Sequence, residues 1–410
     1  MNTKQKFFHK GILFCCLLLI ISITICLISD IAAANTINVK TYSVSAATQP
    51  INIKFKKYST YNKYTRQYYM LRSYLEQLEK DGGGTLTLSA GTYTISNTLY
   101  IPSNVTIYFK NGVIIKKITK TGITSFKSSK AIFQLVAPSK SDKKGAYGGY
   151  EGEKNIHLIG NGTVIIDDNF VTNCLGIIMG HNTNVSISGI TFQNMKSGHF
   201  IELDASKNVI IENNRFIHHK ASETGIKEAI NLDTPDKNTE GFHTIWTTYD
   251  CTPNIDIVIQ NNYFDDLERA IGTHKYSEGK YHENVKILNN KISNTTSDAI
   301  RIMNWLNPII KGNEINSVAG GKGNKRAILA SGVINPTITG NTFIKASRTI
   351  QIMPWKNSGA GSQYNITYNN ISQENISLML KNTLINIEEK FIRINNRYNN
   401  FSSYTDRYYF

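Results

Sequence analysis

A two-strand repeat occupies most of the second half of this 410-residue chain and restricts the possible fold more than any other feature. The second strand of each unit carries a recurring phrase, which reads NVSISGITF, NVIIENNRF, NIDIVIQNNYF, NVKILNNKI, NPIIKGNEI, NPTITGNTF and NITYNNI. One position of the phrase is asparagine at Asn214, Asn262, Asn290, Asn313, Asn341 and Asn369. Repeats of this kind stack as coils, and their asparagines bond the turn backbone from coil to coil. The pattern predicts a parallel β-helix.

The first strand of each unit carries the candidate functional residues. Its segments HFIELD, EAINLD, RAIGTH and DAIRIM align when four isoleucines are placed in register, Ile201, Ile230, Ile271 and Ile300. The alignment stacks two further columns, one of Glu202, Asn231, Gly272 and Arg301, and one of Asp204, Asp233, His274 and Met303. Strand side chains alternate between two faces, so the isoleucines predict a core face. Phe200, Glu202 and Asp204 are expected on the opposite, acidic face.

The rest of the chain predicts the ends and the loops of this domain. Apolar residues at three- and four-residue steps over 61–80, followed by three glycines, predict an amphipathic helix. Long links over 137–154, 234–253 and 275–283 predict a wall of loops beside the acidic face. We therefore expect an all-β fold, a single-stranded right-handed parallel β-helix with an N-terminal capping α-helix. The expected organisation is a signal peptide over 1–34, an extended lead-in over 35–60, the β-helix domain with its helix cap over 61–371, and a C-terminal cap or tail over 372–410.

The start of the chain has the features of a secretory signal. Lys4, Lys6 and Lys10 precede an uncharged apolar run over 11–29, and Ala32-Ala33-Ala34 supplies a cleavage site. This predicts a secreted, extracellular protein cleaved near Ala34. The alternative is an uncleaved leader that anchors the chain in a membrane, because the run has about the 18 residues that begin to suffice for spanning one. The mature chain would keep two cysteines, Cys174 and Cys251, and their pairing stays open.

The charge of the chain indicates its partner. The formal net charge is +15 at pH 7, and such an excess favours an anionic partner. No recognisable nucleic-acid-binding motif accompanies the charge, so we expect an anionic polysaccharide and no nucleic acid. The oligomeric state stays open.

The segment GGGTLTLSAGTYTISNTLYIPSNVTIYF, with the helix before it, resembles the N-terminal cap of the pectate-lyase-like superfamily. The repeats resemble the right-handed parallel β-helix of the same superfamily, and together they cover nearly all of the mature chain. The resemblance implies a carbohydrate-active protein. It does not choose the reaction, because polygalacturonases, pectate and alginate lyases, epimerases and phage depolymerases all share this fold.

The stacked carboxyl groups favour hydrolysis. Asp204 and Asp233 are expected about 4.8 Å apart on neighbouring strands, where they would titrate as a coupled pair, and Glu202 adds a carboxyl about 6.6 Å along the strand. Inverting glycosidases hold acid and base about 6.5–9.5 Å apart, and retaining ones hold nucleophile and acid about 5–5.5 Å apart. Both the inverting and the retaining mechanism therefore stay open. We predict a glycoside hydrolase acting in a groove on the sheet, with these catalytic residues: Asp204, Asp233, Glu202, His274 and Arg301.

A polysaccharide lyase or epimerase of a uronic-acid polymer is the alternative. Lyases of the superfamily take a proton beside a sugar carboxylate, for which His274 or Lys275 is the candidate base. They neutralise that carboxylate with a cation, and Glu202, Asp204 and Asp233, with Asn231, are oxygen ligands of the kind that calcium prefers. The hydrolase requires no cofactor, whereas the lyase would use calcium. A noncatalytic glycan-binding surface protein is a further alternative.

Further substrate contacts are predicted on the same face. The segment DAIRIM resembles the R-I-K segment of polygalacturonases, with Met303 in place of the lysine, which implies that Arg301 holds a sugar carboxylate. In that register the other family positions fall at His199, Glu228 and Arg269, and only Glu228 keeps an acid, so polygalacturonase activity itself is not expected. The predicted substrate-binding residues are Asn231, Glu228, Arg269, Lys275, Asp298, Trp305, Trp246 and Tyr249. The three aromatic residues either stack on sugar rings or anchor the long loops.

Overall fold

The computed structural model describes residues 40–357, 364–398 and 405–410, all within one compact unit, Lys40–Phe410. The expected signal peptide over 1–34 and its cleavage site near Ala34 lie outside the described residues. Among the described residues, no helix is both long and apolar enough to cross a membrane.

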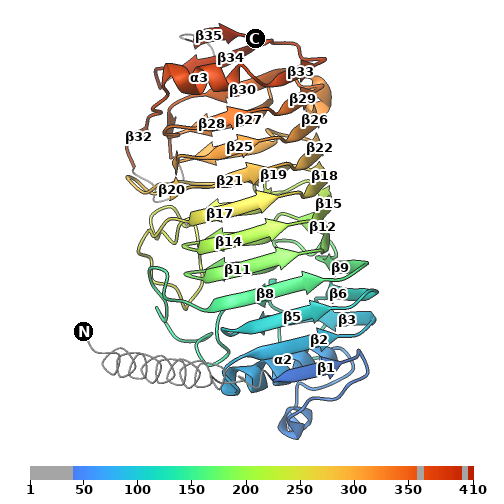
Figure 1. Ribbon diagram of the computed structural model, residues 1–410. Helices are drawn as coiled ribbons and strands as arrows, with labels where there is room; N and C mark the ends of the chain where they lie inside the picture. The colour runs from blue at the N-terminus through green and yellow to red at the C-terminus, as the bar shows by residue number, and fades with distance from the viewer. Residues whose placement is uncertain (1–39, 358–363, 399–404) are drawn as a thin grey trace, which may run out of the picture. The chain divides into compact units, whose positions relative to one another are not determined.

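Three parallel sheets run the length of this unit, and the chain visits them in turn, one strand of each per coil (Figure 1). Sheet 1 consists of β1 (Thr41–Val44), β2 (Gly84–Leu88), β5 (Val105–Phe109), β8 (Lys154–Gly160), β11 (Thr183–Ser188), β14 (Lys207–Glu212), β17 (Ile255–Gln260), β20 (His282–Glu283), β21 (Lys286–Leu288), β24 (Trp305–Leu306), β25 (Ile309–Lys311) and β28 (Thr337–Thr339). Sheet 2 consists of β4 (Leu99–Tyr100), β7 (Ala131–Gln134), β10 (Leu175–Gly180), β13 (His199–Asp204), β16 (Glu228–Asp233), β19 (Arg269–Gly272), β23 (Ile300–Met303), β27 (Arg326–Ser331), β30 (Arg348–Ile352), β34 (Phe391–Asn395) and β35 (Thr405–Tyr409). Sheet 3 consists of β3 (Gly91–Ile95), β6 (Val113–Lys117), β9 (Val164–Asp167), β12 (Thr191–Lys196), β15 (Arg215–Lys220), β18 (Tyr263–Leu267), β22 (Lys291–Thr295), β26 (Glu314–Val318), β29 (Thr342–Ile344) and β33 (Thr383–Ile385). This is the parallel β-helix expected from the repeats.

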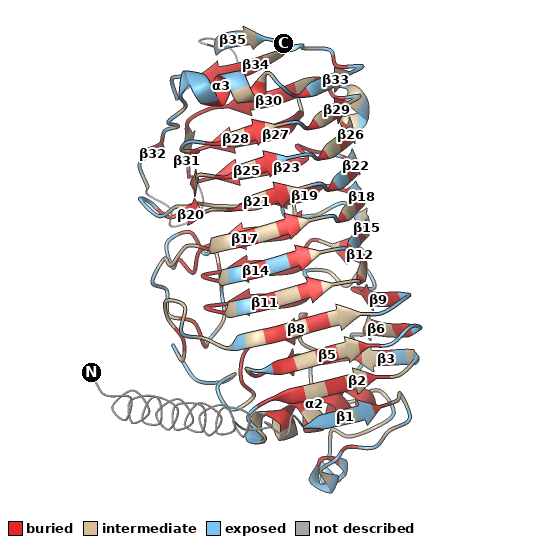
Figure 2. Cartoon of the chain, viewed as in Figure 1, coloured by how far each residue is buried: buried red, intermediate tan, exposed pale blue. Residues whose placement is uncertain are grey.

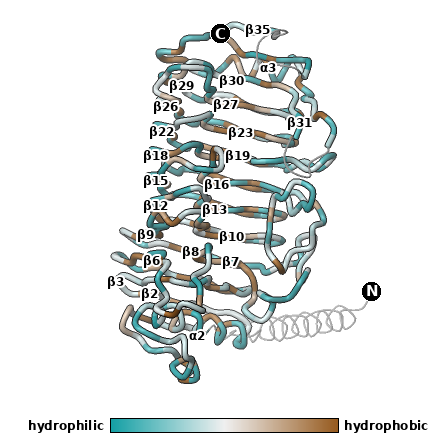
Figure 3. The backbone as a smooth tube through the Cα atoms, turned by 180° about the vertical axis from the view of Figure 1, so that it is seen from behind, coloured by the Kyte–Doolittle hydropathy of each residue, from teal (hydrophilic) through white to brown (hydrophobic). Residues whose placement is uncertain are grey.

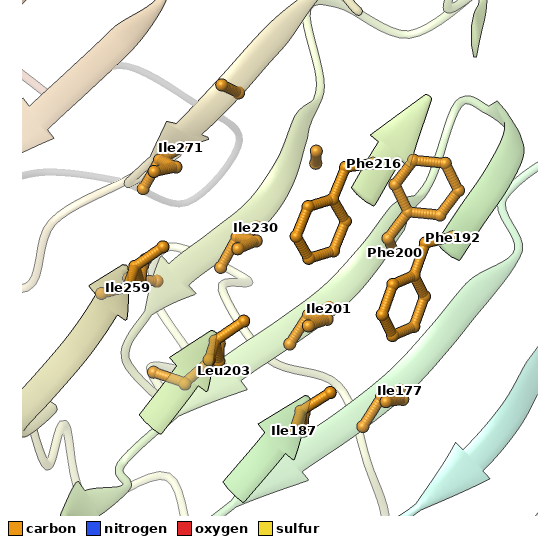
Figure 4. Close-up of a cluster of buried hydrophobic side chains, with 14 of the residues drawn as sticks. Ile177, Ile187, Phe192, Phe200, Ile201, Leu203, Phe216, Ile230, Ile259 and Ile271 are labelled. Atoms are coloured by element: carbon orange, nitrogen blue, oxygen red, sulfur yellow. The ribbon is translucent and has the colours of Figure 1, made fainter. Parts of the chain in front are cut away.

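The core between the sheets has the predicted register. Ile201 pairs with Ile230, Ile230 with Ile271 and Ile271 with Ile300, and all four side chains are buried. Figure 4 shows the side chains of Ile201, Ile230 and Ile271 pointing to the interior, and Figure 2 shows buried residues along the strands of every coil.

Phe200 does not lie on the outward face, where alternation placed it. Its ring centroid lies 6.0 Å from that of Phe192 and 6.0 Å from that of Phe216, and all three rings are fully buried (Figure 4). Phe200 directly precedes the core residue Ile201, so the regular alternation of β13 begins one residue later. The position at the corner between sheets 3 and 2 faces the core.

The asparagine ladder is present but ends at a different residue than expected. From Asn214 to Asn341, the backbone N–H of each asparagine donates to the side-chain oxygen of the next, at 2.9 Å until the last step, where Asn341 donates to Asn382 at 2.8 Å. Asn369 is not a rung, because its side chain accepts from the N–H of Val333. A buried donor needs a partner in every coil, so the ladder stabilises each turn.

The two ends of the solenoid differ. At the N-terminal end, α2 (Arg66–Lys80) forms where the helix was expected, and β1 pairs with β2, so part of the lead-in belongs to sheet 1. A 3-10 helix, η1 (Ile53–Lys57), lies between β1 and α2 in the chain. A second 3-10 helix, η2 (Ala319–Gly321), follows β26.

At the C-terminal end, helical structure is limited to α3 (Gln373–Met379) within the described residues. A short antiparallel pair, β31 (Trp355–Lys356) with β32 (Ile366–Thr367), precedes α3. β33 then pairs with β29, and β34 with β30, in parallel, so the sheets continue past residue 371 to Asn395. β35 pairs antiparallel with β34 and covers the last edge of sheet 2.

Candidate functional site

A pocket of about 360 Å³ lies on the outer surface of sheet 2, over β13 and β16. Seen from behind in Figure 3, these strands run side by side with β10 and β19, and long loops lie along one side of them. The lining residues come from the strands, from the turns before them and from the long loops, and they are Asn173, Leu175, Ile178, Ser197, Gly198, His199, Glu202, Lys227, Asn231, Asp233, Glu240, Gly241, Phe242, His243, Thr244, His274 and Lys275. The loops over 234–253 and 275–283 thus contribute where the insertions predicted a wall.

Two of the predicted carboxyl groups, Glu202 and Asp233, line this pocket, together with Glu240 from the long loop. Glu202 pairs in register with Asn231, whose side-chain amide donates to Glu202 Oε1 at 3.0 Å. Asp233 Oδ1 accepts the backbone N–H groups of His274 at 2.9 Å and Lys275 at 3.3 Å. The two acids are therefore held by different donors, a neutral side-chain amide and a pair of peptide N–H groups.

The third carboxyl group of the predicted set, Asp204, does not face the pocket. It pairs in register with Asp233, as expected, but it is 0% exposed and is absent from the pocket lining. Within the described residues, neither of its carboxyl oxygens accepts a hydrogen bond. Burial, followed by the charges of Glu202 and Asp233, raises its pKa well above the usual range. Asp204 therefore does not touch a ligand in this pocket, contrary to the expectation that it is a catalytic residue.

The pocket acids have raised pKa values for related reasons. Burial, and then the charge of Asp233, raises the pKa of Glu202 well above its ordinary value. Burial also raises the pKa of Asp233, but the charge of His274 and the backbone hydrogen bond from that residue oppose the shift. Glu202 is therefore the carboxyl that keeps its proton more strongly, and Asp233 is the one that ionises more readily.

A buried network of charged side chains lies beside the pocket. It contains three residues that were predicted to bind substrate. Glu228 is fully buried and is paired with Arg269, whose Nε donates to the carbonyl oxygen of Asp298 at 3.2 Å. Asp298 pairs in turn with Arg326 at 2.9 Å. Burial would raise the pKa of Glu228, but the charge of Arg269 and the hydrogen bond from His274 lower it well below its ordinary value. Glu228, Arg269 and Asp298 are thus partners of one another, and none of them lines the pocket.

Two histidines connect this network to the pocket. His274 Nδ1 lies 3.3 Å from Glu228 Oε2, and this hydrogen bond raises the pKa of His274. His199 Nδ1 lies 2.6 Å from the backbone carbonyl oxygen of Glu228, which can only accept, so Nδ1 carries the hydrogen. Burial lowers the pKa of His199 to about 4, which leaves the ring neutral with Nε2 as an acceptor. That nitrogen lies 3.6 Å from Glu202 Oε2.

The other predicted residues divide between the pocket and the packing. Lys275 lines the pocket, and its Nζ donates to the carbonyl oxygen of Thr239 at 2.6 Å. Arg301 is buried outside the pocket, donates to Ser331 Oγ at 3.0 Å, and lies over the ring of Trp355 at 5.2 Å. It is therefore not placed to hold a sugar carboxylate in this pocket, because the neighbouring coils enclose its guanidinium.

Two of the three predicted aromatic residues anchor the chain and do not stack on a sugar in this pocket. Trp246 and Trp305 are buried, and their indole N–H groups donate to Gln134 Oε1 at 2.9 Å and to Thr273 Oγ1 at 2.8 Å. Both anchor the chain and expose no face to a sugar. Tyr249 is 41% exposed, but it is not among the lining residues.

Several lining residues were not predicted individually. Lys227 precedes β16, while Glu240, Phe242 and His243 lie in the long loop before β17. The insertion at 234–253 located that loop, but a loop without periodicity gives no signal for which of its side chains turn toward the sheet. His199 was marked only as the residue that fell at a family position without keeping its type.

Of the three carboxyl groups proposed for calcium, Glu202 and Asp233 line the pocket and Asp204 does not. Among the described residues, no group of three or more His, Cys, Asp or Glu side chains is arranged to hold a metal. Calcium takes six to eight oxygen ligands, whereas Asp204 is fully enclosed and Glu202 and Asp233 already accept protein hydrogen bonds. Cys174 and Cys251 are both free thiols, so no disulfide joins the long loop to the coil of β10.

No family model matches the chain. A curated relative, the plasmin and fibronectin-binding protein A of Streptococcus pneumoniae, is 25% identical over an alignment 264 residues long, which covers 59% of this chain and 36% of that protein. The chain thus spans about a third of that relative's length.

Two solved structures of the Streptococcus pneumoniae surface adhesin PfbA superpose on the chain. One has a TM-score of 0.54 and 17% identity and covers 86% of this chain and 100% of that one. The other has a TM-score of 0.55 and 19% identity and covers 87% and 91%. At these identities the similarity concerns the fold alone. By its sheets, its register and these likenesses, this chain is a parallel β-helix protein.

Proposed function

We propose that the protein is an extracellular glycoside hydrolase that cleaves an anionic glycan in the pocket over β13 and β16. The observation that carries this proposal is the pairing of Glu202 and Asp233 in one pocket with different hydrogen-bond partners. Hydrolysis of a glycosidic bond needs one carboxyl that holds a proton and another that is ionised. Burial and the neighbouring acid favour the protonated form of Glu202, while two peptide N–H groups favour the ionised form of Asp233.

In the proposed reaction, Glu202 donates its proton to the glycosidic oxygen as the bond from that oxygen to the anomeric carbon breaks. Asp233 takes a proton from the attacking water, whose oxygen forms the new bond to the anomeric carbon. The anomeric configuration of the first product distinguishes direct attack by water from a covalent intermediate on Asp233. The neutral ring of His199, whose Nε2 lies 3.6 Å from Glu202 Oε2, adds no positive charge that would favour the ionised form of Glu202.

The preference for an anionic glycan is supported by the cations of the pocket. Lys227, Lys275 and His274 all line it, and the pKa of His274 is raised by its hydrogen bond to Glu228. A sugar carboxylate or sulfate would meet these groups at the mouth of the pocket. Because of the same raised pKa, His274 keeps its proton to higher pH and is less available as the base of a β-elimination, which favours hydrolysis.

Glu202→Gln and Asp233→Asn test the assignment. Each is expected to lower turnover by about 10²–10⁴-fold, because each removes one proton-transfer group. Reducing ends are measured on uronic-acid and sulfated glycans in ¹⁸O-labelled water, and mass spectrometry reads the products. The control is Asp142→Asn, whose side chain is 77% exposed. Fragments lighter by one water, with ultraviolet absorbance, would identify a lyase and contradict the proposal.

A noncatalytic role as a surface adhesin is the second candidate. It is supported by the similarity to a protein named for binding plasmin and fibronectin and described as a surface adhesin. Under this role the pocket retains a ligand without cleaving it. Surface plasmon resonance with immobilised fibronectin, plasmin and anionic glycans, combined with the turnover assay, separates the two. Tight binding to a protein partner that Glu202→Gln leaves unchanged, with no turnover of any glycan, would favour the adhesin.

A further inference from the structure

The outer surface of sheet 2 is covered on the N-terminal side of the pocket. Gly180 pairs in register with Asp204 and therefore precedes Asp204 and Asp233 in one column. A Cβ atom at Gly180 would lie 2.7 Å from two ring carbons of Phe242 and 3.1 Å from a ring carbon of Trp246. Ordinary carbon contacts are about 3.5–4.0 Å, so both rings rest directly on the backbone of β10.

These rings belong to a small apolar cluster outside the main core. Phe242 and Trp246 meet edge to face at 5.4 Å, and Trp246 meets Tyr147 in the same manner at 6.1 Å. The buried members of the cluster are Ala131, Val136, Tyr147, Ile178, Phe242 and Trp246. They join the loops over 137–154 and 234–253 to β7 and β10. They therefore fill the space over sheet 2 where a glycan chain would continue toward the N-terminal coils.

The surface is also covered on the C-terminal side. Gly272 pairs with Arg301 and Arg301 with Leu329, so these residues continue the column of Glu202 and Asn231, and the Arg301 and Leu329 side chains are only 5% and 4% exposed. The ring of Trp355 covers the Arg301 guanidinium.

Tyr276 holds this second cover in place. Its hydroxyl accepts the N–H of Asn357 at 3.0 Å, and the Asn357 side chain donates to the Tyr276 carbonyl oxygen at 2.7 Å. The ring of Tyr276 also stacks on Tyr364 at 6.2 Å. The segment around β31 is thereby attached to the loop after β19, over the coils that follow the pocket.

We infer that this site takes the end of a glycan chain and excludes internal segments of a polymer. The inference rests on the proposed function, because it concerns how the ligand of that pocket is presented. A groove for an internal segment must continue past the site in both directions along the stacked strands. Here Phe242 and Trp246 close one direction, and Trp355 and Tyr276 close the other. The pocket volume of about 360 Å³ lies near the lower limit of ligand sites, about 300–1,000 Å³, which suits a terminal sugar or two.

Phe242 is the specificity-determining residue in this arrangement. It lines the pocket and also forms its end wall against Gly180. Phe242→Ala is expected to open the pocket toward β10 and to admit internal segments. Gly180→Ala is expected to act in the same direction by another route, because its new methyl group displaces the ring. The matched control is Ile245→Ala, in the same loop, since Ile245 is 57% exposed and does not line the pocket.

The test is a binding measurement on Glu202→Gln protein, which cannot consume its ligand under the proposed mechanism. The probes are tetrasaccharides of polygalacturonate and of hyaluronan, either free or blocked with a bulky group at one end or at both ends. Polygalacturonate and hyaluronan polymers, immobilised through both ends, serve as additional probes. Calorimetry or surface plasmon resonance gives the dissociation constants.

The free tetrasaccharide is expected to bind. Binding is expected to be retained when one particular end is blocked and lost when both ends are blocked. The doubly immobilised polymer is expected to bind Phe242→Ala and not the parent protein or Ile245→Ala. Equal binding of free and doubly blocked probes, or no binding of any probe, overturns the inference. End-specific binding without turnover in the wild-type enzyme supports the inference while refuting the hydrolase proposal. If Phe242→Ala does not fold, the parent protein's response to end blocking decides the question alone.

Discussion

Replacing Asp204 by asparagine is expected to stabilise the protein at neutral pH and to destabilise it in acid. Asp204 is 0% exposed, its carboxyl oxygens accept no hydrogen bond from the described residues, and burial with two neighbouring acids raises its pKa. The native state therefore holds a proton that the unfolded chain releases near its ordinary pKa of about 3.9. For such a group the stabilisation is complete below that value and is lost as pH rises toward the raised native pKa.

The magnitude follows from the linkage between pKa and stability. One pKa unit corresponds to about 1.36 kcal/mol, so each pH unit over which the folded protein holds this proton and the unfolded chain does not costs about 1.36 kcal/mol relative to a neutral side chain. An asparagine amide in the same space leaves a donor without a partner, which costs about 1–3 kcal/mol. The Asp204→Asn variant is thus expected to be more stable than wild type by about 1–3 kcal/mol at pH 7.5, and less stable by about 1–3 kcal/mol at pH 4.

Urea unfolding at pH 4, 6 and 7.5 measures this reversal, with unchanged m values as the condition for comparing free energies. Asp142→Asn, at an exposed acid, serves as the control and is expected to change stability by less than about 0.5 kcal/mol at each pH. A loss of stability for Asp204→Asn that is the same at pH 4 and pH 7.5 would refute the reasoning. Asp204 would then be ionised in the folded protein.

Three further changes test other parts of the structure. Asn262→Ala leaves the N–H of Asn214 and the carbonyl of Ile211 unpaired in the buried ladder, so a loss of about 2–4 kcal/mol is expected in chemical denaturation, and a loss below about 1 kcal/mol would contradict this role. Trp246→Ala removes a buried anchor and is expected to cost about 3–5 kcal/mol, whereas unchanged stability with lost glycan binding would indicate sugar stacking instead. Because Glu228 raises the pKa of His274, this pair stabilises the fold fully below pH about 6.5, and the stabilisation is lost as pH rises through the raised pKa. His274→Gln should therefore lower the melting temperature more at pH 6 than at pH 9. An equal effect at both pH values would exclude a charged His274.

The sequence determined which residues share a column of the solenoid. The strand period of two and the repeated phrase placed Ile201 against Ile230 and Asp204 against Asp233, and these pairings are present in the structure. The glycines after residue 80 likewise marked the end of α2. These features are local, because alternation and turn chemistry act over a few residues and the repeat carries them from one coil to the next.

What covers a face was decided only by the tertiary structure. Alternation put Glu202 and Asp204 on the same outward face, yet Glu202 lines a pocket and Asp204 is enclosed. Residues of the 234–253 loop cover Gly180, the neighbour of Asp204 in its column. The same loop brings Phe242 onto Gly180, where the sequence predicted a groove along the sheet. The end of the ladder at Asn382 depends in the same way on α3 filling the place of a strand. Long-range packing of loops has no period in the sequence, so the chemistry of this surface depends on contacts between residues far apart in the chain.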